Sequence, residues 1–182
     1  YISLVKYVSG QKSYILTPKG IKLGDRISKF EDLDISIGNS LKLYNIPVGS
    51  FIHNIQLHPN KSAQIVRSAG CYALLMAKSS RYATVKLPSG EIRLFNIECQ
   101  ATYGRLANES HNNLRRGKAG ITRKLNKRPT VRGAVMNPCD HRHGGGEGRA
   151  PVGLSEPRSI YGGKVNKKTR NDRKSKKHIV KA

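Results

Sequence analysis

The chain is 182 residues long and carries 34 lysines and arginines against 11 aspartates and glutamates, a formal net charge of +23 at pH 7. Repulsion between so many like charges disfavours a free compact protein, so the natural partner is a polyanion. Hydrophobic residues make up 37% of the chain, below the usual level of about 45–50%, which leaves enough for one or two small cores only. No run approaches the roughly 18–20 apolar residues of a membrane span, and we expect no secretory signal.

The cysteine content indicates whether the chain relies on disulfide bonds and which redox compartment it suits. Cys71, Cys99 and Cys139 are widely spaced and odd in number, and no Cys-x-x-Cys pair occurs. This usage argues against a disulfide scaffold and favours a reducing compartment. The sequence begins at Tyr1 instead of Met, which leaves open whether its front was processed or is missing.

Short runs rich in β-branched and aromatic residues fill the first hundred positions and predict strands. In residues 51–57 and 82–87 the odd-numbered side chains would share one face and the even-numbered ones the other. Pro88-Ser89-Gly90 lies between two such runs and predicts a hairpin turn. Short strands at this spacing are typical of an all-β barrel or sandwich. The predicted strands cover residues 1–8, 14–16, 41–44, 51–57, 71–77, 82–87 and 92–95.

Charge and hydrophobicity separate along the chain. Residues 1–100 hold 13 basic and 6 acidic side chains, whereas residues 101–182 hold 21 and 5. Residues 107–116 predict about two helical turns with Leu114 facing inward. After Gly117 few apolar residues remain, so burial cannot offset the entropy of ordering the chain. We therefore expect an irregular basic tail that orders only on its partner.

One segment of this tail, residues 132–149, has an unusual composition. It combines two histidines, two carboxylates, three arginines and the run Gly144-Gly145-Gly146. Each glycine costs roughly 1 kcal/mol relative to alanine in a helix or strand, which disfavours a regular element. The segment predicts a shaped loop whose backbone approaches another surface more closely than side chains would allow.

Basic residues interleaved with glycine and proline predict binding to nucleic acid. Few aromatic residues accompany them, which favours phosphate and shape contacts over base stacking. A shaped loop suits the irregular surface of folded RNA, although DNA compaction stays open. Arg67 is included because Gly70 follows it after a strand. The predicted RNA-binding residues are Arg67, Arg115, Arg116, Lys118, Arg123, Lys124, Arg128, Arg132, Asn137, His141, Arg142, His143, Gly144, Gly145, Gly146, Arg149, Lys167, Lys168, Arg170 and Arg173.

The same loop supports an alternative of another class. Cys139, His141 and His143 alternate along the chain and could converge on zinc, with Asp140 or water as a fourth ligand. Asp140 beside His141 could serve acid–base chemistry. No nucleophile motif accompanies these residues, so we expect no enzyme, no bound metal and no cofactor. The two histidines are instead expected to hydrogen-bond RNA or to hold the shape of the loop.

Taken together, the motifs resemble a known family. Met136-Asn137-Pro138, Asp140-His141 and His143-Gly144-Gly145-Gly146-Glu147-Gly148-Arg149 are similar to the signature of the universal large-subunit ribosomal protein two, of bacterial or organellar type. Asn45-Ile46-Pro47-Val48-Gly49, Arg67-Ser68-Ala69-Gly70 and Leu87-Pro88-Ser89-Gly90 fit the same family in collinear order. The resemblance runs from about Tyr14 to the C-terminus.

The resemblance implies a partial oligonucleotide-binding barrel in residues 1–38, an SH3-like barrel in residues 39–107 and a basic RNA-binding extension in residues 108–182. It implies a structural component of the large ribosomal subunit that binds ribosomal RNA, contacts neighbouring ribosomal proteins and supports subunit association and the peptidyl-transferase region. His141 would lie nearest that region, and Arg67 would be an RNA contact of the barrel. The family's front strands are absent here, so a separate chain or another segment is expected to complete the first barrel.

The chain also departs from the family pattern. Cys139 stands where the family has an apolar residue, which weakens the zinc alternative, and Arg142 stands in place of a proline. Tyr161-Gly162 replaces a Trp-Gly pair in the tail. This divergence and the abundance of Lys, Ile, Asn, Ser and Tyr favour a mitochondrial ribosome, with a plastid or the bacterial cytoplasm as alternatives.

Overall fold

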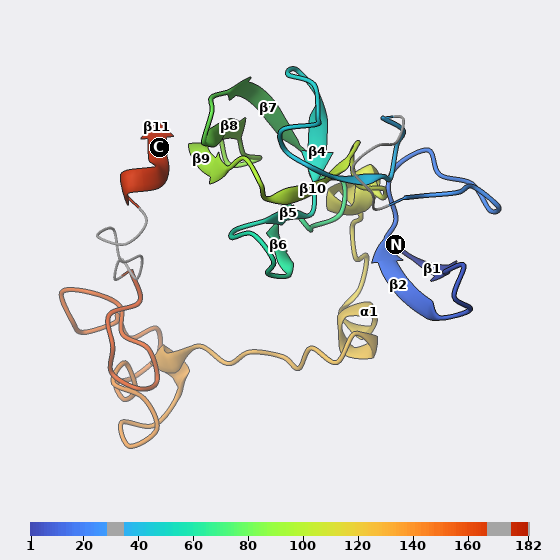
Figure 1. Cartoon of the computed structure of the whole chain (residues 1–182). Helices are drawn as coiled ribbons and strands as arrows, with labels where there is room; N and C mark the ends of the chain where they lie inside the picture. The colour runs from blue at the N-terminus through green and yellow to red at the C-terminus, as the bar shows by residue number, and fades with distance from the viewer. Residues whose placement is uncertain (29–34, 167–175, 182) are drawn as a thin grey trace. The chain divides into compact units, whose positions relative to one another are not determined.

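The computed structural model describes residues 1–28, 35–166 and 176–181 (Figure 1). The chain divides into two units, Tyr1–Leu114 together with Asp172–Ala182, and Arg115–Asn171. The first unit holds the 3₁₀-helices η1 (Glu109–Asn113) and η3 (Lys176–His178), and the second holds α1 (Ala119–Lys124) and η2 (Gly133–Val135). The strands, all in the first unit, are β1 (Ile2–Lys6), β2 (Lys12–Leu16), β3 (Ser40–Lys42), β4 (Phe51–His53), β5 (Ile55–Gln56), β6 (Ala63–Ile65), β7 (Ala73–Lys78), β8 (Tyr82–Lys86), β9 (Ile92–Asn96), β10 (Gln100–Tyr103) and β11 (Ile179–Lys181).

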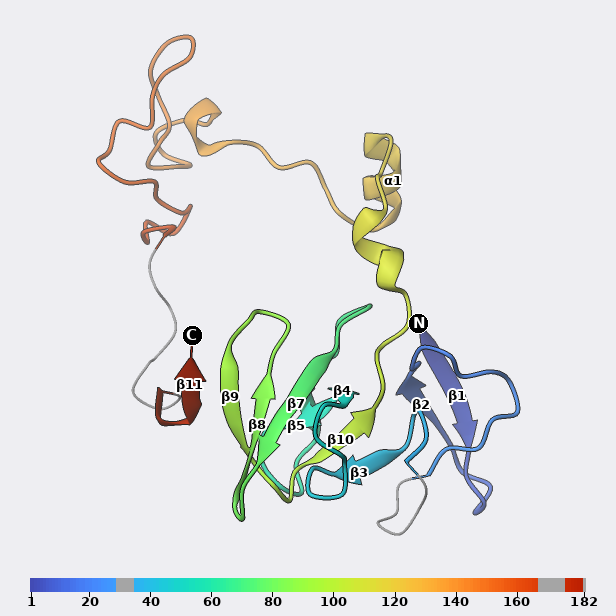
Figure 2. The ribbon, with the colours of Figure 1, turned by 90° about the horizontal axis from the view of Figure 1, so that it is seen from above.

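The first unit is all-β, as the sequence predicts. Seven antiparallel strands form one sheet in the order β11-β9-β8-β7-β4-β10-β3, while β1-β2 and β5-β6 form separate two-stranded ladders. Leu41 of β3 and Phe95 of β9 lie far apart in the strand order but belong to the same buried cluster. The sheet therefore curves around one core, and Figure 2 shows its strands bending in this way.

The β8 strand and the turn that follows it confirm the predicted pattern. Ala83 and Val85 are fully buried, whereas Lys86 is exposed. The Leu87 N–H donates to the Glu91 carbonyl across 2.9 Å, which closes the hairpin between β8 and β9. The antiparallel pairing of β8 with β9 places Lys86 on the outer face of the sheet.

The alternation predicted for residues 51–57 is wrong. Ile52 and His53, which the pattern places on opposite faces, are both buried, because the strand does not continue through residues 51–57. Asn54 adopts a left-handed backbone with φ of 51°, a conformation that asparagine tolerates better than most residues. Its N–H donates to the Val66 carbonyl across 2.9 Å. The chain therefore leaves the large sheet after β4 and continues as β5 in a different ladder.

The helical predictions are also wrong in detail. Residues 107–116 form only η1, and the Leu114 side chain is 68% exposed instead of facing inward. The short helix α1 lies in the region predicted to be irregular, and it contains no buried residue. A helix without a buried face has no apolar period, so the sequence pattern could not reveal it. The predictions also missed β6, β10 and β11.

His53 is the largest polar side chain in the core of the sheet. It is 1% exposed, and its Nδ1 donates to the Gly104 carbonyl across 2.9 Å. Burial lowers the pKa of His53 from its ordinary value of 6.5, and the hydrogen bond to Gly104 offsets part of that effect. The folded protein therefore holds this imidazole in its neutral form more strongly than the unfolded chain does.

This burial predicts a loss of stability in mild acid. Because the folded pKa of His53 is lowered, the unfolded chain binds the proton first as the pH falls below 6.5. We expect the thermal midpoint of the full chain to fall between about pH 7 and pH 5, and His53→Gln to weaken that dependence while lowering the midpoint at neutral pH. His111→Gln, which removes an exposed imidazole, serves as the control. Equal pH dependence in the wild type and in His53→Gln would contradict this account.

Candidate nucleic-acid interface

The second unit lacks an apolar core in the part that the structure describes. None of residues 115–166 is fully buried. The same residues include 12 lysines and arginines and 3 acidic residues. A segment of this composition depends on hydrogen bonds for its shape, because it buries too little apolar surface to hold itself together.

Backbone hydrogen bonds fold residues 136–149, named here the glycine loop, back on themselves. The Asn137 carbonyl accepts the N–H groups of Asp140 and His141 across 3.0 and 3.2 Å. The Gly144 N–H donates to the His141 carbonyl across 2.9 Å, and the Gly145 N–H donates to the Met136 carbonyl across 3.1 Å. These four bonds close two successive turns and bring the glycines against residues 136–138.

This closure explains why glycine is required at two positions. A Cβ atom at Gly144 would collide with the carbonyl group of Asn137. Gly145 has a φ of 86°, and a Cβ there would lie 2.8 Å from the Pro138 ring. The segment is a shaped loop, as predicted, and the close approach at these positions is to other residues of the same loop. The glycines therefore need no external surface to explain them.

The two histidines of the loop have fixed hydrogen-bonding roles. The His143 N–H donates to His141 Nδ1 across 3.0 Å, and the Arg158 N–H donates to His143 Nε2 across 2.8 Å. A ring nitrogen that accepts a hydrogen bond carries no proton, so each neutral ring carries its proton on the other nitrogen. Protonating either acceptor would break the bond it makes. His141 is left with one N–H donor, on Nε2, and His143 with one on Nδ1.

A second turn, in residues 156–165, contacts the glycine loop through Arg142 and His143. The Ser159 N–H donates to the Gly163 carbonyl and the Gly162 N–H to the Ser159 carbonyl, each across 2.8 Å. Arg142 Nε would lie 2.8 Å from a Cβ atom at Gly162, so the guanidinium rests on this glycine. Together with the bond from Arg158 to His143, this contact joins residues 156–165 to the glycine loop.

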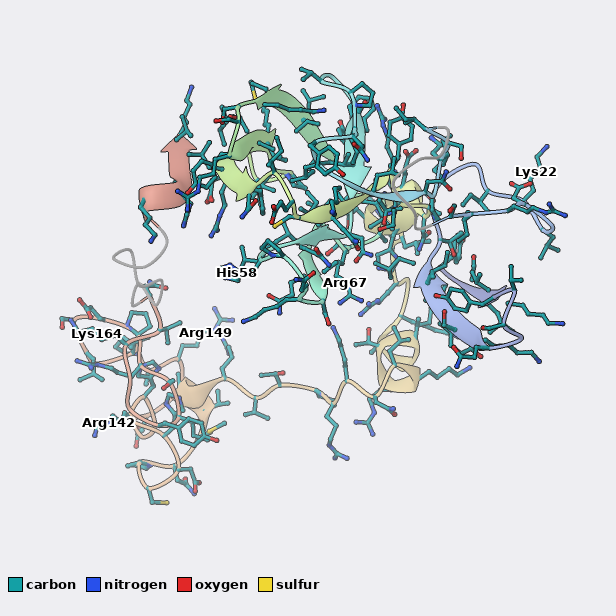
Figure 3. All side chains as sticks on the ribbon, viewed as in Figure 1. Lys22, His58, Arg67, Arg142, Arg149 and Lys164 are labelled. Carbon is teal, nitrogen blue, oxygen red and sulfur yellow. The ribbon has the colours of Figure 1, made fainter. Side chains whose placement is uncertain are left out.

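The predicted basic residues within the described part of the chain all lie at the surface. The structure brings Asn137, Arg142 and Arg149 into the glycine loop with the two histidines. Arg142 and Arg149 are exposed (Figure 3), whereas His141 and His143 are half-buried. Arg115, Arg116, Lys118, Arg123, Lys124, Arg128 and Arg132 are exposed in the segment before it. Lys167, Lys168, Arg170 and Arg173 lie outside the described residues.

Arg67 belongs to the first unit and is exposed there (Figure 3). The glycine that led to its selection has another explanation. Gly70 has a φ of 70°, and a Cβ atom would lie 2.7 Å from Glu109 Cα. This glycine accommodates η1, so it gives no support to an RNA contact at Arg67, which rests on charge and exposure alone.

Sequence reasoning missed two further features. Arg158 orients His143 through its backbone N–H, which no side-chain pattern reveals. Phe51, Tyr72 and Arg105 meet on the outer face of the sheet although they are distant in sequence. To find this cluster from the sequence, one would need to know the strand register that brings the three residues together.

The metal alternative gains no support from the geometry. Within residues 1–28, 35–166 and 176–181, no three His, Cys, Asp or Glu side chains are placed to hold a metal ion. One ring nitrogen each of His141 and His143 already accepts a backbone N–H, and Cys139 is exposed.

No described helix is long and apolar enough to span a membrane.

Comparison with protein families identifies a family that matches most of this chain. A family model described as the C-terminal domain of ribosomal proteins L2 matches residues 36–162. The matched range, 127 of the 182 residues, runs from β3 of the large sheet through the glycine loop to the turn at Gly162. The chain therefore belongs to the family of ribosomal proteins L2 and is a protein of the large ribosomal subunit.

Proposed function

We propose that this chain binds ribosomal RNA as a structural component of the large subunit, with no catalysis of its own. The observation that carries the proposal is the combination found in residues 115–166: 12 basic and 3 acidic residues, and no fully buried side chain. RNA phosphates neutralise such a surface and release their counterions, which favours binding.

The construction of the glycine loop suits this role. Its shape comes from backbone and imidazole hydrogen bonds, so Arg149 at its end and Arg132 in the segment before it are left exposed. An arginine fork binds phosphate oxygens in a bidentate manner, which positions the protein on folded RNA. The Nε2–H group of His141 adds one neutral donor to this set.

The finer assignments rest on the family resemblance. We propose that the chain contacts neighbouring ribosomal proteins, supports subunit association and reaches the peptidyl-transferase region with His141 nearest to it. We also propose a mitochondrial ribosome as its location, on the composition of the sequence, with plastid or bacterial ribosomes as the alternatives.

The domain boundaries extend this proposal to the front of the chain. We keep residues 1–38 as part of an oligonucleotide-binding barrel, residues 39–107 as an SH3-like barrel and residues 108–182 as the basic extension. The β1-β2 ladder supports the first assignment, since it is separate from the large sheet. Ile2, Leu4 and Tyr14 on this ladder and Tyr1 just before it are 57–76% exposed, so the ladder presents apolar surface that further strands would cover.

The proposal predicts a steep salt dependence. If the chain neutralises about 8–12 phosphates, the logarithm of its affinity for large-subunit RNA should fall with the logarithm of salt concentration at a slope of about −6 to −10.

We expect Arg67→Ala to weaken binding by about 1–3 kcal/mol, because a charged hydrogen bond is lost. Arg26→Ala removes another exposed arginine, one outside the predicted set, and is the control. A slope near zero would contradict the electrostatic account, and an unchanged affinity in Arg67→Ala would remove Arg67 from the interface.

A second prediction concerns His141. Because its Nδ1 accepts a backbone N–H, we expect it to hold geometry and to transfer no proton. His141→Gln keeps polarity and removes the imidazole, so fully assembled subunits carrying it should form peptide bonds within several-fold of the wild-type single-turnover rate. A drop of about a thousandfold, with loss of a pH inflection near neutrality, would favour a catalytic role instead.

The third prediction tests the completion of the front barrel. Lys6 and Lys12 lie opposite each other at the end of the β1-β2 ladder. In intact large subunits we expect amine crosslinks from these lysines to a protein segment outside the 182 residues. The intact mass of the chain, about 20.1 kDa if it is a separate polypeptide, identifies whether that segment is covalently continuous. Crosslinks confined to this chain would contradict the completion.

A further inference from the structure

We propose that the outer face of the large sheet carries a binding site for one unstacked RNA base, formed between the Phe51–Tyr72 ring pair and the turn after β8. This inference rests on the proposed RNA-binding function and names a specific contact within it. All the residues of the site belong to the first unit.

The strand register assembles the site. Phe51 of β4 pairs with Leu74 of β7, and Leu74 pairs with Lys86 of β8, so the three side chains form a row across three strands. Their chain neighbours Ile52 and Val85 are fully buried in the core. Because side chains alternate along a strand, the row of Phe51, Leu74 and Lys86 lies on the opposite, outer face.

A hollow of about 420 Å³ lies over this row. Its volume falls within the range of about 300–1,000 Å³ that is typical of small-ligand sites. The hollow is therefore large enough for one base. Leu74 provides an apolar floor, and the exposed Lys86 supplies a positive charge at the edge. The lining residues are Phe51, Gly70, Cys71, Tyr72, Leu74, Lys86, Leu87, Pro88 and Gly90.

The aromatic wall of the hollow is held in place by a cation. The rings of Phe51 and Tyr72 meet edge to face, with centroids 4.9 Å apart and planes at 82°. The Arg105 guanidinium carbon lies 3.9 Å from the Phe51 centroid and 4.4 Å from the Tyr72 centroid, so it packs against both. Tyr72 nevertheless remains 40% exposed. A fixed, partly exposed ring beside a charge is suited to stacking.

The chemistry of the hollow fits a nucleotide. The ligand needs a flat apolar face for the rings and a negative group within reach of Lys86. A base with its phosphate has both, and the +23 charge of the chain favours an anionic partner over an apolar peptide. The chain has no Trp and only 3 Phe residues, so overall composition hides this local grouping. In our proposal, the sequence-based preference for phosphate and shape contacts over base stacking does not extend to this face.

The test compares two single-stranded RNA oligomers of equal length, one with bases and one abasic, which carry the same phosphates. We expect the full wild-type chain to bind the oligomer with bases about five- to a hundredfold more tightly, as one stacked base contributes. Tyr72→Leu should remove this preference without changing the affinity for the abasic oligomer, and Tyr72→Phe should keep it. Tyr161→Leu changes a tyrosine that is 96% exposed in the second unit and should leave the preference intact.

A fluorescence measurement on the wild type covers the case in which Tyr72→Leu fails to fold. An oligomer carrying 2-aminopurine should lose fluorescence on binding, because stacking quenches this base analogue. Equal binding of the two oligomers, no quenching, or a preference that survives in Tyr72→Leu would overturn the base site. If large-subunit RNA itself does not bind, the proposed function fails instead, so the two failures are distinguishable.

Discussion

In the extension, the backbone carbonyls of Met136, Asn137 and His141 take the role that a hydrophobic core has in the sheet. They accept the N–H groups that turn the glycine loop back on itself, and a side chain at Gly144 would block this closure. The constraint behind this arrangement is charge. A chain with a net charge of +23 and 37% hydrophobic residues supports one curved sheet with a core, and little apolar surface remains for the segment beyond it. The extension must therefore obtain its shape from polar groups.

This construction separates shape from charge. The bonds that fold the loop come from main-chain groups and from the rings of His141 and His143, so the fold of the loop does not consume its arginines. The sheet shows a different solution, in which Arg105 lies on Phe51 and Tyr72 and holds an aromatic wall on the outer face. In our proposal, the two units thus offer RNA two kinds of contact: phosphate binding along the extension and stacking on the sheet.

The sequence predicted the parts of the fold in which one periodicity governs a whole element. Ala83 and Val85 alternate into the core over an unbroken strand, and the all-β class followed from several runs of this kind. The pattern failed at Asn54, where a single left-handed residue moves the chain from one ladder to another, and at Leu114, which has no core to face. The candidate loop could be located from its composition alone. Its hydrogen-bonding roles, such as that of Arg158, depend on backbone geometry that a residue pattern does not encode.

We propose that the basic extension is the main RNA-binding surface of this L2 family protein. Ultraviolet protein–RNA crosslinking in intact large subunits, mapped to residues by mass spectrometry, tests it most directly. The account predicts that crosslinks to large-subunit RNA concentrate in residues 115–166, with His141 and its neighbours among them, and that a smaller group includes Tyr72. Crosslinks spread evenly over exposed residues of the sheet and absent from residues 115–166 would contradict it.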